Sequence, residues 1–105
     1  MTVGDVILCV NMEKPNAYEE KTLFDWVSRL ENTIRAEIMH GEAAELSYPD
    51  GMNAPLSAPA MFERIYAEYV FAMIDFQNQE YSAYQNEMEQ FNESYDGLAK
   101  WYMRT

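Results

Sequence analysis

Cysteine and histidine are almost absent from this chain of 105 residues, which has one of each, Cys9 and His40. A single cysteine excludes an internal disulfide framework and every metal site that needs several thiolates. A single histidine likewise excludes sites built from several imidazoles. We see no apolar run long enough to cross a bilayer and no basic segment ahead of an apolar stretch at the N-terminus. We therefore expect neither a membrane span nor a signal peptide.

Basic residues are also scarce, with 7 Lys and Arg against 18 Asp and Glu and a formal net charge of -11. This balance argues against a basic surface that binds phosphate backbones or anionic lipid. The acids are spread along the chain and form no acidic tail, which indicates a charged folded surface. Hydrophobic residues make up 49% of the chain, which argues against disorder and suffices for one modest core.

Apolar residues recur at helical spacing in four segments, and no period-two alternation predicts strands. The expected helices cover about residues 3–12, 18–40, 59–78 and 80–102. A long loop at 41–58 contains the turn signal Tyr48-Pro49-Asp50-Gly51, and a loop of this length is typically functional or ordered only by a partner. The sequence thus predicts one all-α domain over residues 1–105 with a C-terminal antiparallel helical hairpin.

Short-range signals predict how several of these helices begin and end. Thr2 with Asp5 reads as a capping box for the first helix. Gly41 suits the position after the end of the second helix. Ser57 is the expected N-cap of the third helix, with Pro59 in its first turn.

The last two helices are expected to form the hairpin, because only Asn78 and Gln79 link them. Asn78 is the residue expected to take the left-handed conformation there. Gly97 predicts a weakened last turn in the fourth helix. The facing side chains should be Tyr69, Met73 and Phe76 from one helix and Tyr81, Tyr84 and Met88 from the other.

The residues that most often carry chemistry have simpler interpretations in this chain. We interpret His40 as the end of the second helix and Cys9 as a largely buried packing residue. Glu37 and His40 match the Glu-x-x-His spacing of carboxylate metal centres once, but the second copy that such centres need is missing. No phosphate loop, nucleophile elbow or zinc spacing is found. We therefore expect no catalytic residue, no cofactor and no metal, and hence a protein that is not an enzyme.

Three large apolar residues, Leu8, Phe71 and Trp101, fall off the apolar stripes that would build a four-helix core. Isolated exposed apolar residues are normal, but three in so small a chain favour a subunit or partner interface. The sequence alone thus indicates an acidic, helical interaction protein.

Both ends of the chain carry recognisable motifs. The N-terminal ones are Met1-Thr2-Val3-Gly4-Asp5-Val6-Ile7, Lys14-Pro15-Asn16-x-Tyr18, Lys21 and Trp26-Val27-x-x-Leu30-Glu31. The C-terminal ones are Tyr69, Ile74-Asp75-Phe76-x-Asn78-x-Glu80, Tyr84-x-Asn86-x-Met88-x-x-Phe91-Asn92-x-x-Tyr95 and Ala99-x-Trp101-Tyr102-x-Arg104-Thr105. With these motifs the chain resembles head–tail connector, or adaptor, proteins of Gram-positive-type siphophages and prophages. The resembling sequences tend to have glycine where this chain has Gln79.

The resemblance implies a structural protein of the virion, present in the host cytoplasm during assembly. Its partners would be further copies of itself in a ring, the portal, and head-completion or tail proteins. DNA would only pass through the channel of the ring, without specific binding, and no membrane would be involved. The alternative is an acidic helical inhibitor or DNA mimic that binds a host or phage protein. Such a mimic needs carboxylates spaced like phosphates on one connected face.

Overall fold

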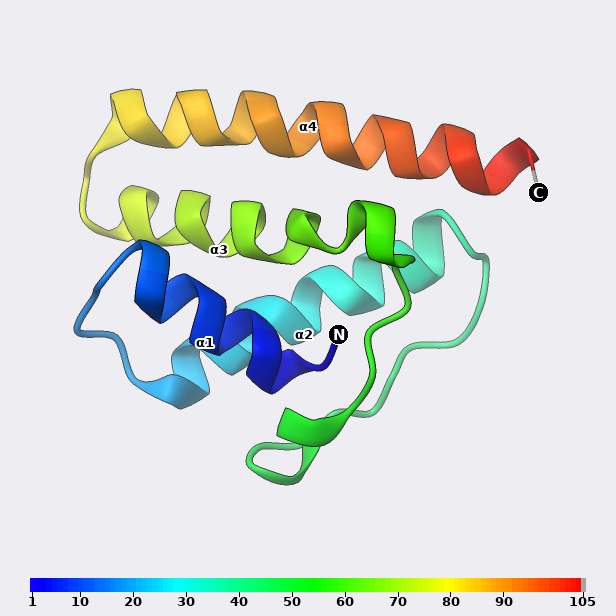
Figure 1. The fold of residues 1–105 in the computed structure, drawn as a ribbon, viewed down its shortest axis with the longest axis horizontal. Coiled ribbons are helices and arrows are strands. Elements are labelled where there is room, and N and C mark those ends of the chain that lie inside the picture. Colours follow the sequence, from blue (N-terminus) through cyan, green and yellow to red (C-terminus); the bar gives the residue numbers. More distant parts are fainter. Residues whose placement is uncertain (105) are drawn as a thin grey trace.

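Residues 1–104 are described by a computed structural model, which shows an all-α fold (Figure 1). The α-helices are α1 (Val3–Glu13), α2 (Glu20–Glu37), α3 (Arg64–Gln77) and α4 (Tyr81–Arg104), and the 3-10 helices are η1 (Asp50–Asn53) and η2 (Ala60–Phe62). Within residues 1–104 the only β-type pairing is an isolated bridge between Thr2 and Pro55. The predicted fold class and its four helices are therefore confirmed.

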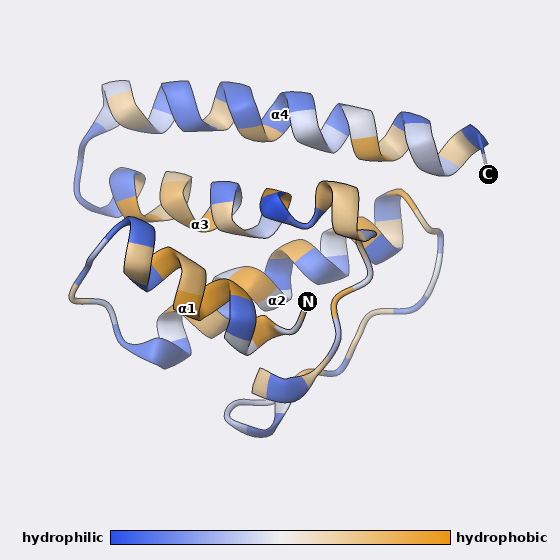
Figure 2. Ribbon diagram, in the orientation of Figure 1, coloured by the Kyte–Doolittle hydropathy of each residue, from blue (hydrophilic) through white to orange (hydrophobic). Residues whose placement is uncertain are grey.

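The helices pack with α3 in the middle. Figure 1 shows α4 along one side of α3 and α1 with α2 along the other. Because α3 is covered from both sides, its buried residues surround the helix: Ile65, Tyr66, Ala67, Val70, Ala72, Ile74 and Asp75. In α4 only Phe91 and Leu98 are buried, and Figure 2 shows that helix as mostly hydrophilic. The outer surface of α4 is thus a polar face.

The beginning of α1 follows the prediction. Thr2 accepts a hydrogen bond from the Asp5 backbone, and the Asp5 carboxylate accepts one from the Thr2 backbone, which confirms the capping box. The helix then buries Val3, Val6, Ile7 and Val10 against the rest of the core.

The predicted end of α2 was three residues too late, because the helix ends at Glu37. His40, and not Gly41, takes the left-handed backbone conformation, with φ 54°. Histidine is among the residues that tolerate this region, and the Gly41 backbone N–H still donates to the Arg35 carbonyl at 2.8 Å.

The hairpin between α3 and α4 forms as expected at its tip, where the Phe76 ring lies 5.9 Å from that of Tyr81 and 5.1 Å from that of Tyr84. The residue with left-handed backbone is Gln79, with φ 60°, whereas Asn78 has φ -83°. The prediction for Asn78 was therefore wrong by one position. The strain falls where the resembling connector sequences tend to have glycine.

Replacing Gln79 with glycine should stabilise the hairpin. A left-handed conformation costs a residue with a Cβ about 1–2 kcal/mol, and part of that gain is offset by the entropy that glycine loses on folding. We expect Gln79→Gly to raise the free energy of unfolding by up to about 1 kcal/mol in a urea titration. Asn78→Gly is the matched control and should lower stability, because φ is negative there. A Gln79→Gly chain no more stable than the wild type would contradict this account.

The long connection between α2 and α3 is ordered by contacts within the chain. The Val3 backbone N–H donates to the Ala54 carbonyl, and the Leu56 backbone N–H donates to the Met1 carbonyl. The Tyr48 ring packs edge-on against the Phe24 ring of α2, with centroids 5.5 Å apart. These contacts hold the segment against α1 and α2.

Gly97 does not weaken the end of α4, which continues as a helix to Arg104. A Cβ added at Gly97 would lie 3.4 Å from the Phe62 ring. The glycine therefore lets Phe62 pack closely against α4, and the predicted weak last turn was wrong.

Candidate interaction surface

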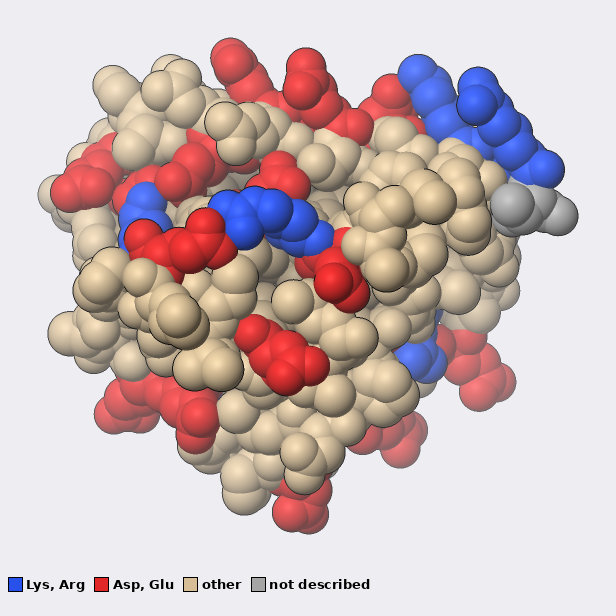
Figure 3. Space-filling view, viewed as in Figure 1, with Lys and Arg blue, Asp and Glu red and all other residues tan. Residues whose placement is uncertain are grey.

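Acidic side chains dominate the charged surface. Within residues 1–104, five Lys and Arg side chains form ion pairs with acids of the same chain: Lys14, Lys21, Arg35, Arg64 and Lys100. Figure 3 shows the acids scattered over the visible face, where several lie against Lys and Arg atoms and others are separated by uncharged atoms. On this face the negative charge is therefore diffuse and forms no single connected acidic patch.

Leu8, the first predicted interface residue, lies on the outer side of α1 and is 62% exposed. Met12 follows one turn later and is 75% exposed. Residues four apart are neighbours on a helix surface, so the two form an apolar ridge, here called the α1 ridge. Met12 was not predicted, although its spacing of four residues from Leu8 was a usable signal.

Phe71, the second predicted interface residue, is half-buried in the packing of α1 on α3. The Lys14 ammonium lies 5.9 Å from its ring centroid and the Arg64 guanidinium 5.7 Å. Arg64 also holds the Glu13 carboxylate of α1 through two hydrogen bonds of 2.8 and 2.7 Å. The chain's own cations thus contact this ring, which contributes to joining α1 to α3.

Trp101, the third predicted interface residue, is half-buried near the end of α4, with its ring 6.1 Å from that of Phe62. It forms part of the wall of an apolar cavity of about 190 Å³, here called the Trp101 recess. The other residues that line this recess are Ile34, Ile38, Met39, Ser57, Ala58, Pro59, Leu98 and Tyr102. The recess lies where the ends of α2 and α4 meet the segment before η2, away from α1 (Figure 1).

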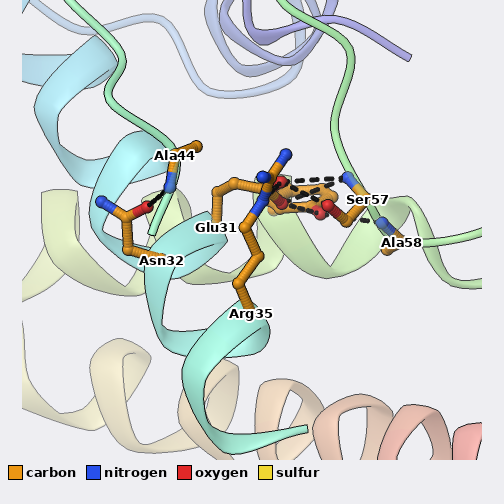
Figure 4. A network of polar contacts seen from close by, with 7 residues as sticks. Glu31, Asn32, Arg35, Ala44, Ser57 and Ala58 are labelled. Carbon is orange, nitrogen blue, oxygen red and sulfur yellow. Dashed lines mark hydrogen bonds and ion pairs between the residues drawn. The ribbon is translucent and has the colours of Figure 1, made fainter. Parts of the chain in front are cut away.

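A buried carboxylate holds the wall of this recess in place. The Glu31 carboxylate of α2 is fully buried and accepts hydrogen bonds from the Ser57 hydroxyl at 2.6 Å, the Tyr66 hydroxyl at 2.8 Å and Arg35 Nε at 2.7 Å (Figure 4). The Ser57 backbone N–H also donates to it, and the Ala58 backbone N–H donates to the Tyr66 hydroxyl. Ser57, which lines the recess, is therefore held by Glu31 through both its hydroxyl and its backbone N–H.

The prediction that Ser57 caps the third helix was wrong. Pro59 occupies the N-cap position of η2, and α3 begins only at Arg64. The Ser57 hydroxyl is already engaged by Glu31, which lies 26 positions earlier in the chain.

Cys9 is only half-buried, so the prediction that it is largely buried was wrong. Its thiol donates a hydrogen bond of 2.8 Å to the Glu13 carboxylate, which draws the side chain toward the surface. This hydrogen bond, together with burial, raises the pKa of the Cys9 thiol. A raised thiol pKa lowers the thiolate fraction and with it the reactivity.

Glu37 and His40 do not act together. The Glu37 carboxylate accepts a hydrogen bond of 2.7 Å from the Tyr95 hydroxyl, and His40 is exposed beyond the end of α2. Within residues 1–104, no three His, Cys, Asp or Glu side chains are grouped so that they could hold a metal ion. None of the described helices has the length and apolar character needed to cross a membrane.

Comparison with protein-family models, with curated proteins and with solved structures gives no match to this chain.

Proposed function

We propose that this chain is a non-enzymatic structural subunit of a phage particle, similar to head–tail connector proteins, and that copies of it form a ring beneath the portal. One observation carries the proposal, namely that motif residues from the two ends of the chain bond to each other. Lys14 binds Asp75 at 2.6 Å, and the Tyr18 hydroxyl donates to the Asn78 side chain at 2.7 Å. The residues behind the resemblance therefore belong to one shared scaffold.

The two apolar surface features suit a ring. A closed ring uses heterologous contacts, in which one patch of each subunit meets a different patch of the next. The α1 ridge protrudes, the Trp101 recess is concave, and they lie on separate parts of the molecule. In the proposed ring, the ridge of one subunit packs into the recess of its neighbour.

The charge of the chain fits a passive DNA channel. DNA binds proteins mainly through cations that neutralise its phosphates, and at least five of the seven Lys and Arg side chains here already pair with acids. A ring with such a surface would let DNA pass without holding it. The same charge causes repulsion between subunits, which salt screens.

Light scattering across a salt series tests the proposed contact. We expect the wild type to form larger species as salt or protein concentration rises, and Leu8→Glu to remain monomeric. Full burial of a leucine contributes about 1.5–3 kcal/mol, so the loss should weaken association at least about tenfold. Trp101→Ala should weaken association in the same way. Gln85→Glu, on the exposed polar face of α4, adds the same charge as Leu8→Glu and should behave like the wild type.

The opposite outcome would favour the alternative function. A strict monomer at high protein and salt concentration, with Trp101→Ala leaving particle assembly intact, would contradict the ring and support an acidic monomeric inhibitor. The gene neighbourhood gives an independent test. Genes for portal, protease and major capsid proteins upstream and for tail proteins downstream would support the connector.

A further inference from the structure

Charged side chains from α1, α3 and α4 meet in a partly buried cluster. Lys14, the C-cap of α1, places its ammonium 2.6 Å from Asp75 Oδ2 and 3.0 Å from Glu87 Oε1. The Asp75 side chain is completely buried, and those of Glu87 and Lys14 are only 23% and 27% exposed. Two carboxylates therefore share one cation, with little access to water.

The second oxygen of each carboxylate has no hydrogen-bond partner. These oxygens, Asp75 Oδ1 and Glu87 Oε2, are both buried. An ionised carboxylate can only accept hydrogen bonds, whereas a protonated one can also donate. If both groups were ionised, the cluster would have one excess negative charge and two unsatisfied buried oxygens, which is costly.

We propose that the Glu87 carboxyl carries a proton when the three helices are packed, so that the cluster acts as a pH-sensitive lock joining α1, α3 and α4. The proton removes one of the two negative charges that share the Lys14 ammonium. The cluster then holds one ammonium, one carboxylate and one carboxylic acid, and its net charge is zero. The device is independent of ring assembly.

The pKa of Glu87 agrees with this arrangement. Burial raises it above the ordinary value of 4.5, and the neighbouring Asp75 carboxylate raises it further, against the opposing effect of Lys14. For an acid with a raised pKa in the folded state, the protonated form is the one that folding favours. Its stabilising contribution is complete below pH 4.5 and is lost as the pH rises through the folded-state pKa.

Three further charged groups lie around the cluster. From α1 and α3, Glu13 and Arg64 neutralise each other in a two-bond ion pair at its edge. Also from α3, Glu68 lines the same cleft as Glu87 and accepts a hydrogen bond from Ser94 of α4. Burial raises the pKa of Glu68 as well, so any test must separate the two carboxyls.

The decisive test combines carboxyl-carbon NMR titration of the wild type with unfolding measurements at several pH values. We expect the Glu87 carboxyl to titrate above pH 4.5. We expect Glu87→Gln to abolish the loss of folding stability that accompanies this titration as the pH rises. Glutamine is neutral at every pH, as protonated Glu87 is, so this variant should match the wild type at low pH and be more stable at high pH. Each pKa unit removed corresponds to a tenfold change in the ratio of folded to unfolded chain.

Two controls define the result that would overturn the lock. The controls are Glu89→Gln, on the exposed side of α4, and Glu68→Gln, in the same cleft. Both should retain the change in unfolding free energy that accompanies the titration of Glu87. A wild-type Glu87 carboxyl that titrates at or below pH 4.5 would overturn the proposal. So would a Glu87→Gln profile identical to that of Glu89→Gln. If Glu87→Gln does not fold, the wild-type titration alone decides.

Discussion

Glu31→Ala should lower the free energy of unfolding by about 2–5 kcal/mol, because it removes the acceptor of at least two buried donors. Glu31 has no exposed surface, and its carboxylate collects hydrogen bonds from Ser57, Tyr66 and Arg35. Without the carboxylate, the Ser57 backbone N–H and the Tyr66 hydroxyl lose their acceptor in a site with little water. A buried donor left unpaired costs about 1–3 kcal/mol.

The damage should spread to the Trp101 recess. Glu31 and Asn32 are two of the α2 residues that hold the long connection. They bind Ser57 and the Ala44 backbone N–H, which lies 2.8 Å from Asn32 Oδ1 (Figure 4). Since Ser57 and Ala58 also line the recess, Glu31→Ala should weaken self-association as well as stability.

Urea unfolding near pH 7 measures the effect, with Asp25→Ala as the control on the same helix. Asp25 forms an exposed ion pair with Lys21 at 3.1 Å, and such pairs contribute less than about 1 kcal/mol. A loss for Glu31→Ala no larger than that of Asp25→Ala would show that the buried network is energetically inert.

The pH dependence of the unfolding free energy gives a second test of the Glu31 network. Burial acts to raise the pKa of Glu31, but the hydrogen bonds from Ser57, Arg35 and Tyr66 together bring it below the ordinary value of 4.5. The ionised form is therefore the one that folding favours, so its contribution is present above pH 4.5 and is lost as the pH falls through the folded-state pKa. Glu31→Ala should lack this acid-dependent loss of stability.

Most of the fold could be predicted because helices depend on short-range patterns. The capping box of Thr2 and Asp5 spans four residues, and the link between α3 and α4 is only three residues long. One error arose where a distant contact decides. Ser57 has a typical capping side chain, but a buried carboxylate of α2 engages it. At the hairpin the error was local. The Gln79 N–H donates to the Phe76 carbonyl and the next N–H along the chain donates to the Asp75 carbonyl, a Schellman motif that puts the left-handed backbone at Gln79.

The candidate surface was predictable to different degrees. Leu8 lies opposite the buried face of α1, so helical periodicity alone places it on the surface. Phe71 contacts Lys14 and Arg64, and no local pattern predicts that two cations would lie over its ring. The Trp101 recess is formed by three separate segments of the chain, so its shape exists only in the folded protein.

The packing of Gly51 also could not be predicted from the sequence, which marks this glycine only as a turn residue. In the structure it is buried against α2, and an added Cβ would lie 2.8 Å from Phe24 Cζ and 3.4 Å from Leu46 Cβ. Real Cβ atoms essentially never approach a ring atom that closely, so Phe24, itself only 2% exposed, would have to move. Overpacking of this kind typically costs about 1–3 kcal/mol.

We therefore expect Gly51→Ala to destabilise the chain by about 1–3 kcal/mol in thermal or urea unfolding. Gly41→Ala provides the matched control, because an added Cβ there has nothing within 4 Å and the backbone φ is not positive. That change should be neutral or stabilise by about 0.4–1 kcal/mol, since alanine restricts the unfolded chain. Equal stabilities for the two variants would mean that the connection does not pack against Phe24 as described. The contact of Gly51 with α2 would then contribute nothing to holding the long connection in place.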